Sequence, residues 1–279
     1  MITARTSTRS VAAFSAAVIA AVLAACDWPT PPRNARLYAP PIVYARWWKM
    51  TEECSGRTAR LADLKWYRTP GAVVTLHGKQ VAGYWASNGN FIVVAEDYMK
   101  FGRVVRHEML HALVRQGGHP REDFLEKCAA IVDCPAECVA EAGTWTPPPE
   151  FVDAPPESFT LSQEITLRDR ESDGDRFLEL RVRALNAHDS TLRLVVPDFP
   201  EFTPTFRYLL FGPSGAVSND VRANDPSQLF FAAGQAKEVL FDFPVSDTLT
   251  PRSVTTGEIL VSGGFGTRWL PSQGVSVTH

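Results

Sequence analysis

The sequence predicts an α+β domain over residues 42–146 followed by an all-β sandwich over residues 157–279. Segments with helical and strand patterns alternate in the first region, whereas apolar residues recur at every second position in the second region. Between them, residues 147–156 contain two proline clusters and are predicted to be a linker. A chain of 279 residues is also long enough for two domains of ordinary size.

The N-terminal segment has the pattern of an export signal. Two arginines precede an apolar run of about 15 residues, which is shorter than the ~20 residues needed to span a membrane. The run ends in Leu23-Ala24-Ala25-Cys26, which resembles the bacterial lipobox. This resemblance implies that residues 1–25 are a lipoprotein signal peptide and that Cys26 is lipidated. The protein would then be exported and anchored to the bacterial cell membrane on its periplasmic or extracellular face. Residues 26–41, rich in proline, are predicted to be an extended tether.

The remaining cysteines are even in number, and disulfides are the default in an oxidising compartment. Their spacing lacks the paired C-x2-C knuckles of a convincing structural zinc site. We therefore expect two disulfides, and three pairings are possible. We favour one that joins the first cysteine to the region of the other three. These cysteines are Cys54, Cys128, Cys134 and Cys138.

A helix predicted from about Lys100 to Gln116 carries the sequence His107-Glu108-Met109-Leu110-His111. Two imidazoles at i and i+4 lie on one helix face and can hold one metal ion. Glu108 projects to the side, where it can take a proton from a metal-activated water and pass it to a leaving group. The pattern predicts a Zn²⁺ site with Glu108 as general base. We expect Gly117-Gly118 to supply a left-handed cap at the end of this helix.

The motif and its helix resemble those of the zincin metallopeptidases. This resemblance covers roughly Val73–Cys128 and implies hydrolysis of peptide bonds. It also implies an edge strand upstream of the helix, here Phe91–Ala95, that aligns the substrate by β-addition. The metzincin subclass would require glycine in place of Val114 and histidine in place of Gly117, so it is excluded.

Two residues compete for the place of third zinc ligand. His119 follows a glycine pair that lets the chain turn back, and His119-Pro120 followed by Phe124 looks similar to SprT-like domains. Glu137 lies on a following helix, where thermolysin-like enzymes carry their glutamate ligand. We favour His119, because imidazole is the commoner zinc ligand. Candidates of lower rank are Glu122 and Glu126.

Other conspicuous residues are expected to have structural roles. His77 and His188 fall in predicted turns, and His279 is terminal. Tyr98 is predicted to pack beside the start of the motif helix, and Trp47-Trp48 to lie in the core.

In the second region Leu178, Leu180 and Val182 alternate with charged residues, which gives a strand one apolar and one charged face. About seven such strands, with few helical signals, are typical of an antiparallel sandwich that looks immunoglobulin-like in pattern alone. Further strands are predicted at Phe159–Leu167, Leu192–Val196, Phe206–Phe211, Leu229–Ala232, Val239–Phe243 and Glu258–Val261.

The sequence therefore predicts a zinc peptidase that is anchored to the cell envelope and acts on proteins or peptides, with the sandwich recruiting substrate or a partner. Two alternatives stay open: a lipid-anchored binding protein without catalysis, and a zinc amidase that acts on cell-wall peptides. A net charge of −3 gives no reason to expect a nucleic-acid partner. The sequence also lacks a phosphate-binding loop and a nucleophile elbow.

Overall fold

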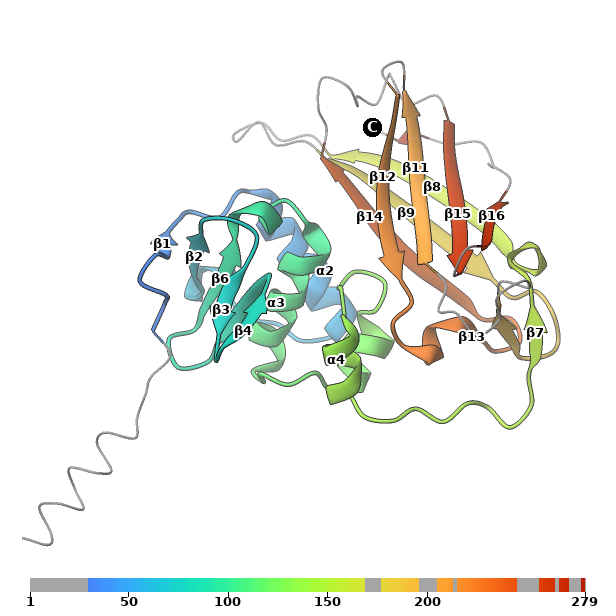
Figure 1. Cartoon of the computed structure of the whole chain (residues 1–279), viewed down its shortest axis with the longest axis horizontal. Helices are drawn as coiled ribbons and strands as arrows, with labels where there is room; N and C mark the ends of the chain where they lie inside the picture. Colours follow the sequence, from blue (N-terminus) through green and yellow to red (C-terminus); the bar gives the residue numbers. More distant parts are fainter. Residues whose placement is uncertain are drawn as a thin grey trace, which may run out of the picture.

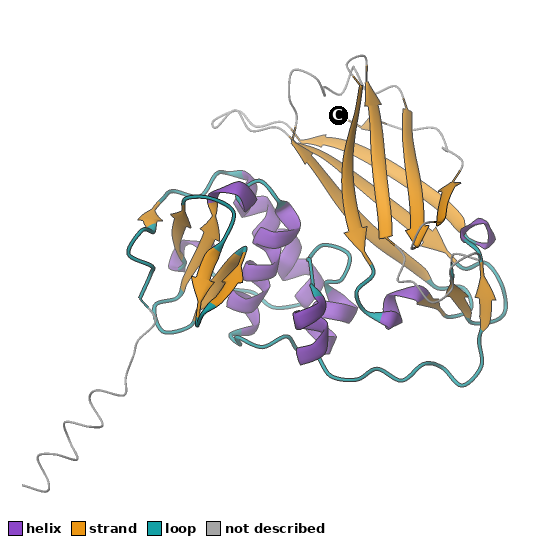
Figure 2. Ribbon diagram, in the orientation of Figure 1, coloured by secondary structure: helices purple, strands orange, loops and turns teal. Residues whose placement is uncertain are grey.

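The computed structural model describes residues 30–168, 177–195, 205–212, 215–244, 256–263, 266–270 and 277–278. The signal segment with Cys26, and also His279, lie outside the described residues. Within those residues, every helix is too short or too polar to cross a membrane. Helices and a small sheet make up the N-terminal part, and longer strands make up the C-terminal part (Figure 1, Figure 2).

In the N-terminal part a four-stranded sheet has the order β1-β2-β6-β5. Strand β6 (Phe91–Ala95) runs parallel to β2, whereas β5 (Gly83–Ala86) is antiparallel to β6 and lies at the edge. The expectation that Phe91–Ala95 is the edge strand is therefore wrong, and β5 has that place. The turn between β5 and β6 contains Asn88-Gly89, a dipeptide that favours hairpin turns. The other strands are β1 (Arg36–Leu37), β2 (Lys65–Thr69) and a separate hairpin of β3 (Val74–Leu76) and β4 (Lys79–Val81).

Two helices cover this sheet and share one core with it. Helix α2 (Val43–Ser55) buries Trp47 and Trp48, as predicted, and Trp47 stacks on Tyr44. Tyr44 also meets Trp66 of β2 edge to face, which ties the helix to the sheet. The helix ends at Gly56, whose positive φ of 68° suits a left-handed cap.

The motif helix α3 (Gly102–Val114) is buried on almost every side. Its left-handed cap is Arg115, with φ 56°, and not the glycine pair that we expected. The π-helical segment η3 (Glu122–Lys127) and helix α4 (Ala136–Glu141) follow. Two disulfides fasten this region, one joining Cys54 of α2 to Cys128, and one joining Cys134 to Cys138.

Both proline-rich stretches contain short strands. Arg36–Leu37, within the expected tether, pairs with β2, and Tyr38 packs against Trp66. Strand β7 (Val152–Ala154), within the expected linker, pairs in parallel with β10. The ends of both stretches are therefore docked on the folded parts.

The C-terminal part contains two four-stranded sheets, of order β14-β9-β8-β17 and β12-β11-β15-β16, and a three-stranded sheet β13-β10-β7. Tyr208 of the second sheet contacts Phe241 and Phe243 of the first, so these two sheets pack against each other. The sequence did not predict β7, β12, β16 or β17. The strands are β8 (Thr160–Arg168), β9 (Phe177–Leu185), β10 (Leu192–Leu194), β11 (Thr205–Gly212), β12 (Gly215–Arg222), β13 (Phe230–Phe231), β14 (Ala236–Pro244), β15 (Thr256–Gly263), β16 (Gly266–Leu270) and β17 (Val277–Thr278).

The outward face of β9 and β14 docks on the N-terminal part. Glu179 and Asp242 are cross-strand partners, so both project from the same face of the sheet. Arg46 of α2 binds Glu179, with its Nε 2.6 Å from Oε1, and Arg106 of α3 binds Asp242 at 2.7 Å. The Leu240 amide adds a backbone hydrogen bond across the same junction.

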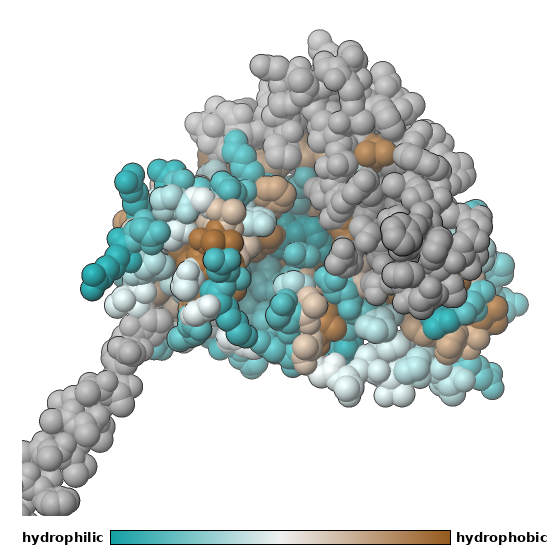
Figure 3. Space-filling model, in the orientation of Figure 1, coloured by the Kyte–Doolittle hydropathy of each residue, from teal (hydrophilic) through white to brown (hydrophobic). Residues whose placement is uncertain are grey.

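Exposed apolar side chains are dispersed over the described surface. Figure 3 shows hydrophobic residues as separate patches between hydrophilic ones, without one continuous band in this view. Scattered apolar residues are normal for a folded domain and indicate no binding face. The large ones are Leu37, Ile42, Val73, Phe101, Phe151 and Val152.

Candidate metal centre

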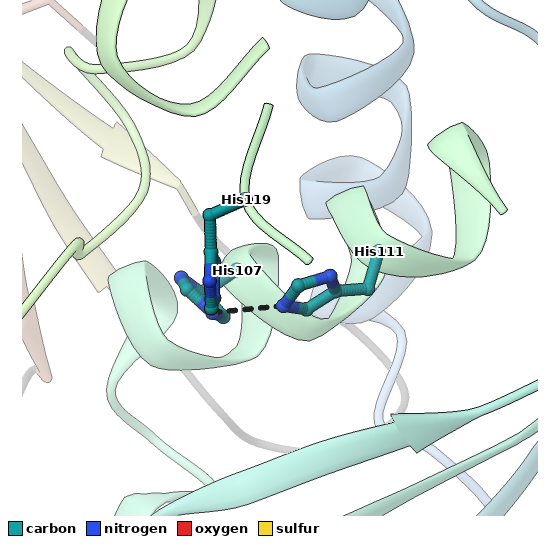
Figure 4. Close-up of side chains that lie close together, drawn as sticks. All are labelled: His107, His111 and His119. Atoms are coloured by element: carbon teal, nitrogen blue, oxygen red, sulfur yellow. Dashed lines mark hydrogen bonds between the residues drawn. The ribbon is translucent and has the colours of Figure 1, made fainter. Parts of the chain in front are cut away.

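Three histidines converge at the C-terminal half of α3. His107 and His111 lie one helical turn apart, and the loop after α3 brings His119 over them (Figure 4). The Nε2 atom of His107 lies 3.1 Å from the Nε2 of His111 and 3.1 Å from that of His119. In a tetrahedral site with Zn–N bonds of 2.0–2.1 Å, ligand nitrogens are separated by about 3.3–3.4 Å. Two of the three nitrogen–nitrogen distances are therefore close to those between ligands of one zinc ion, and the three ligand nitrogens all lie within 4.8 Å of one another.

The outer nitrogen of each ring fixes its tautomer. Nδ1 of His107 lies 2.5 Å from the Asp133 carbonyl oxygen, and Nδ1 of His111 lies 2.8 Å from that of Gln116. A carbonyl oxygen only accepts, so both Nδ1 atoms must donate and both Nε2 atoms carry a lone pair. His119 makes the same kind of bond, at 2.7 Å, to the carboxylate of Glu141. Three lone pairs facing one another repel unless a cation lies between them.

Burial and mutual repulsion favour the neutral form of His107 and His111. Desolvation, followed by the neighbouring His111 and His119, lowers the pKa of His107 well below its usual value. Desolvation also lowers the pKa of His111 to about 4, with a further lowering by His119. A neutral imidazole is the form that binds a metal ion.

The ring of Phe124, on η3, closes one side of the cluster. Its centroid lies 4.7 Å from the His111 ring and 5.0 Å from those of His107 and His119. On the other side, His119 keeps 14% of its side-chain surface exposed, so solvent reaches the site. A fourth coordination position would therefore be accessible to water or substrate.

The segment from Cys128 to Cys134 holds His107 in place. It supplies the Asp133 carbonyl to His107, and the disulfides described above fasten both of its ends. Arg103 donates to the carbonyl oxygens of Ala129, Ala130 and Val132. Arg106 donates to that of Ile131 at 2.6 Å. Both arginines come from α3, so the helix that carries His107 also holds the segment that orients His107.

Glu108 lies against edge strand β5. A Cβ atom placed on Gly83 would lie 3.3 Å from the Glu108 Cγ, so this glycine leaves room for the carboxylate. Burial raises the pKa of Glu108 to about 8, and a backbone hydrogen bond from Trp85 offsets part of that rise. A carboxyl group with a pKa near neutrality can both accept and return a proton.

The structure separates the other candidate residues from this cluster. Glu137 is exposed in the first turn of α4, and Glu122 is exposed and paired with Lys127. Glu126 is also exposed. His77 lies in the turn between β3 and β4, and His188 in an exposed bend, as predicted.

Tyr98 packs against Phe101 near the start of α3, as the sequence led us to expect. Glu141 was not predicted to have a role. It lies one helical turn beyond Glu137 on α4, and that spacing is the only signal in the sequence that could have pointed to it.

The sequence matches no protein-family model and no curated protein. Among solved structures, Northeast Structural Genomics Consortium target SoR45 aligns with 42% of this chain and 86% of its own, at 8% identity and a TM-score of 0.26. A penta-heme cytochrome c552 from Thermochromatium tepidum aligns with 68% of this chain and 54% of its own, at 11% identity and a TM-score of 0.19. Such low scores establish no common fold, so function is argued from the site.

Proposed function

We propose that this protein is a zinc-dependent peptidase of the zincin type, with His107, His111 and His119 as metal ligands and Glu108 as general base. The observation that carries the proposal is the convergence of three imidazole nitrogens within 4.8 Å of one another, each ring held by an acceptor on its Nδ1. Hydrogen bonds of this kind orient imidazole ligands in zinc sites and raise their basicity.

Zinc, when bound, lowers the pKa of a coordinated water and polarises a carbonyl group. The chain's own residues supply the other functions. Glu108 follows His107 directly and is held against β5, where it can accept a proton. Among the described strands, β5 lies at the edge of its sheet, where an extended peptide could add as a further strand.

We also propose that the enzyme is exported and lipid-anchored through Cys26, which rests on the Leu23–Cys26 pattern. The two disulfides support an oxidising compartment, because such bonds are rare in the reducing cytosol. Substitution Cys26→Ser should release the protein from the membrane fraction and abolish its lipidation. A variant that is still acylated and membrane-bound would contradict the lipobox assignment.

The catalytic role is tested with Glu108→Gln, which removes the proton acceptor and no metal ligand. The variant should keep one zinc per chain, measured by elemental analysis, and lose at least a hundredfold in peptide hydrolysis. Casein fragments and purified cell-wall peptides should be assayed side by side, because hydrolysis of the latter alone would favour the amidase. Wild-type turnover in Glu108→Gln would exclude its role as base.

The ligand set is tested by zinc titration of matched variants. His119→Ala removes a converging nitrogen and should weaken zinc binding severely, whereas Glu137→Ala, on exposed α4 surface, should leave it intact. The reverse ranking would transfer the third-ligand role to Glu137. A wild-type protein that takes up no zinc would favour the non-catalytic binding protein.

A further inference from the structure

A second candidate site lies where the C-terminal sheets meet the N-terminal part. The structure has a cavity of about 660 Å³ whose walls come from both packed sheets, from β10 and β13, and from η3. This volume is within the usual range of pockets that enclose small ligands. Its lining is mostly apolar and includes Phe159, Val182, Ala184, Leu194, Phe231 and Val239.

One position in this lining breaks the pattern of the strand that carries it. On β14 the inward positions are Lys237, Val239 and Phe241, which pair with Ala184, Val182 and Leu180 of β9. An apolar residue is expected at each inward position of such a sheet. Lys237 instead places an ammonium group on the apolar side.

The positive charge of this ammonium group has little counter-charge nearby. Its Nζ donates to the Ser227 carbonyl oxygen at 2.6 Å and lies 5.1 Å from the centre of the Phe231 ring. The nearby Asp225 is already bound to Arg121 at 2.5 Å, and among the described residues no carboxylate is within ion-pair distance of Nζ. Burial accordingly lowers the pKa of Lys237 to about 8. An ammonium group has three N–H donors, so a ligand can supply acceptors for the donors that the protein leaves unused.

We propose that this cavity binds an amphiphilic anion of the fatty-acid type, with the alkyl chain against the apolar walls and the carboxylate on Lys237. The apolar lining favours a hydrocarbon chain, and a carboxylate would provide the counter-charge that Lys237 lacks. The proposal does not depend on the histidine site or on peptidase activity.

The test uses the purified mature chain and a dansyl-labelled undecanoate as fluorescent probe. The probe should bind saturably to one site per chain and be displaced by laurate. Dodecanol has a similar chain without the charge and should displace it at least tenfold less well, because it lacks the charged hydrogen bond to Lys237. Absence of saturable binding, or equal displacement by the two compounds, would overturn the proposal.

Two variants and one control locate the site. Lys237→Met keeps the side-chain length and should weaken laurate binding about tenfold or more with dodecanol binding unchanged. Its melting temperature should not fall, since it restores the apolar pattern, and this shows that weaker binding does not reflect unfolding. Ala184→Trp fills the cavity beside Lys237 and should abolish the binding of both laurate and dodecanol. Lys79→Met, on exposed β4, should change neither. Unchanged laurate binding in Lys237→Met would refute the assignment.

Discussion

The buried ion pair between Arg106 and Asp242 should make the two parts of the chain unfold together. Arg106 belongs to the motif helix and Asp242 to β14, and their side chains are 0% and 3% exposed. Gly102 provides the space for this contact, because a Cβ there would lie 2.5 Å from the Asp242 Oδ2. Substitution Asp242→Ala leaves the Arg106 guanidinium buried beside Trp47 without its carboxylate partner.

Removing one partner of a buried ion pair costs about 3–5 kcal/mol, because the other charge stays desolvated. For a chain of this size that loss corresponds to a fall of about 6–20 °C in melting temperature. A control at an exposed site is Asp153→Ala, since the Arg193–Asp153 pair is bidentate but has side chains 33% and 44% exposed. Exposed pairs contribute about 0–1 kcal/mol.

Urea unfolding with the disulfides intact, monitored by tryptophan fluorescence and circular dichroism, measures the free energy of unfolding of each variant. We expect one cooperative transition for the wild type. The free energy of unfolding should fall strongly in Asp242→Ala and only slightly in Asp153→Ala. The double substitution Arg106→Met/Asp242→Leu should recover most of the stability, because it removes both buried charges. A loss below about 1 kcal/mol in Asp242→Ala, or two separate transitions in the wild type, would refute the coupling.

Four further outcomes are expected. Gly102→Ala should lower the melting temperature, although alanine is favoured in helices by about 1 kcal/mol, because its Cβ would displace Asp242; a gain in stability would contradict this contact. Replacing Cys54 and Cys128 by serine opens a loop of sequence separation 74 and should cost about 4.5 kcal/mol. Replacing Cys134 and Cys138, separated by 4, should cost about 2 kcal/mol, and denaturant curves that reverse this order would be inconsistent with the loop argument. Glu141→Gln should weaken zinc affinity about tenfold, at the low end of the range for second-layer residues because Glu141 is 51% exposed, and competition with a chelator measures the change. Zinc at about 1,000 times its dissociation constant should stabilise the wild type by about 4 kcal/mol in thermal melts and His119→Ala much less, so equal stabilisation would exclude His119 as a ligand.

The strongly periodic elements could be predicted from the sequence. The alternation in β9 and the helix carrying His107 and His111 both occur where expected. Short strands such as β1 and β7 could not be predicted, because two or three residues beside prolines carry no period. The zincin and immunoglobulin-like classes stay predictions.

The candidate site could be predicted in part. The i, i+4 spacing placed His107 and His111 on one face, and the expected turn brought His119 to them. The expected role of the glycines in that turn was wrong, since Arg115 has the left-handed conformation. The acceptors behind each ring lie up to 26 residues away in sequence, and such contacts follow from tertiary packing alone.

The charged face of β9 shows the limit of pattern reading. Alternation correctly separated Glu179 from Leu178 and Leu180, and a charged face is ordinarily taken as solvent-exposed. In the structure Glu179 is 5% exposed, because Arg46 of α2 covers it. The sequence pattern specifies which residues share a face and contains no information on what packs against that face.

The disulfides around the Cys128–Cys134 segment have a consequence for when the proposed zinc site can form. This segment holds His107 through the Asp133 carbonyl, and its two ends gain their covalent attachment only once the thiols are oxidised. A newly made chain in a reducing cytosol would have a loosely held His107 and a weak zinc site. Under the proposed function, peptide hydrolysis would then arise only after export to an oxidising compartment.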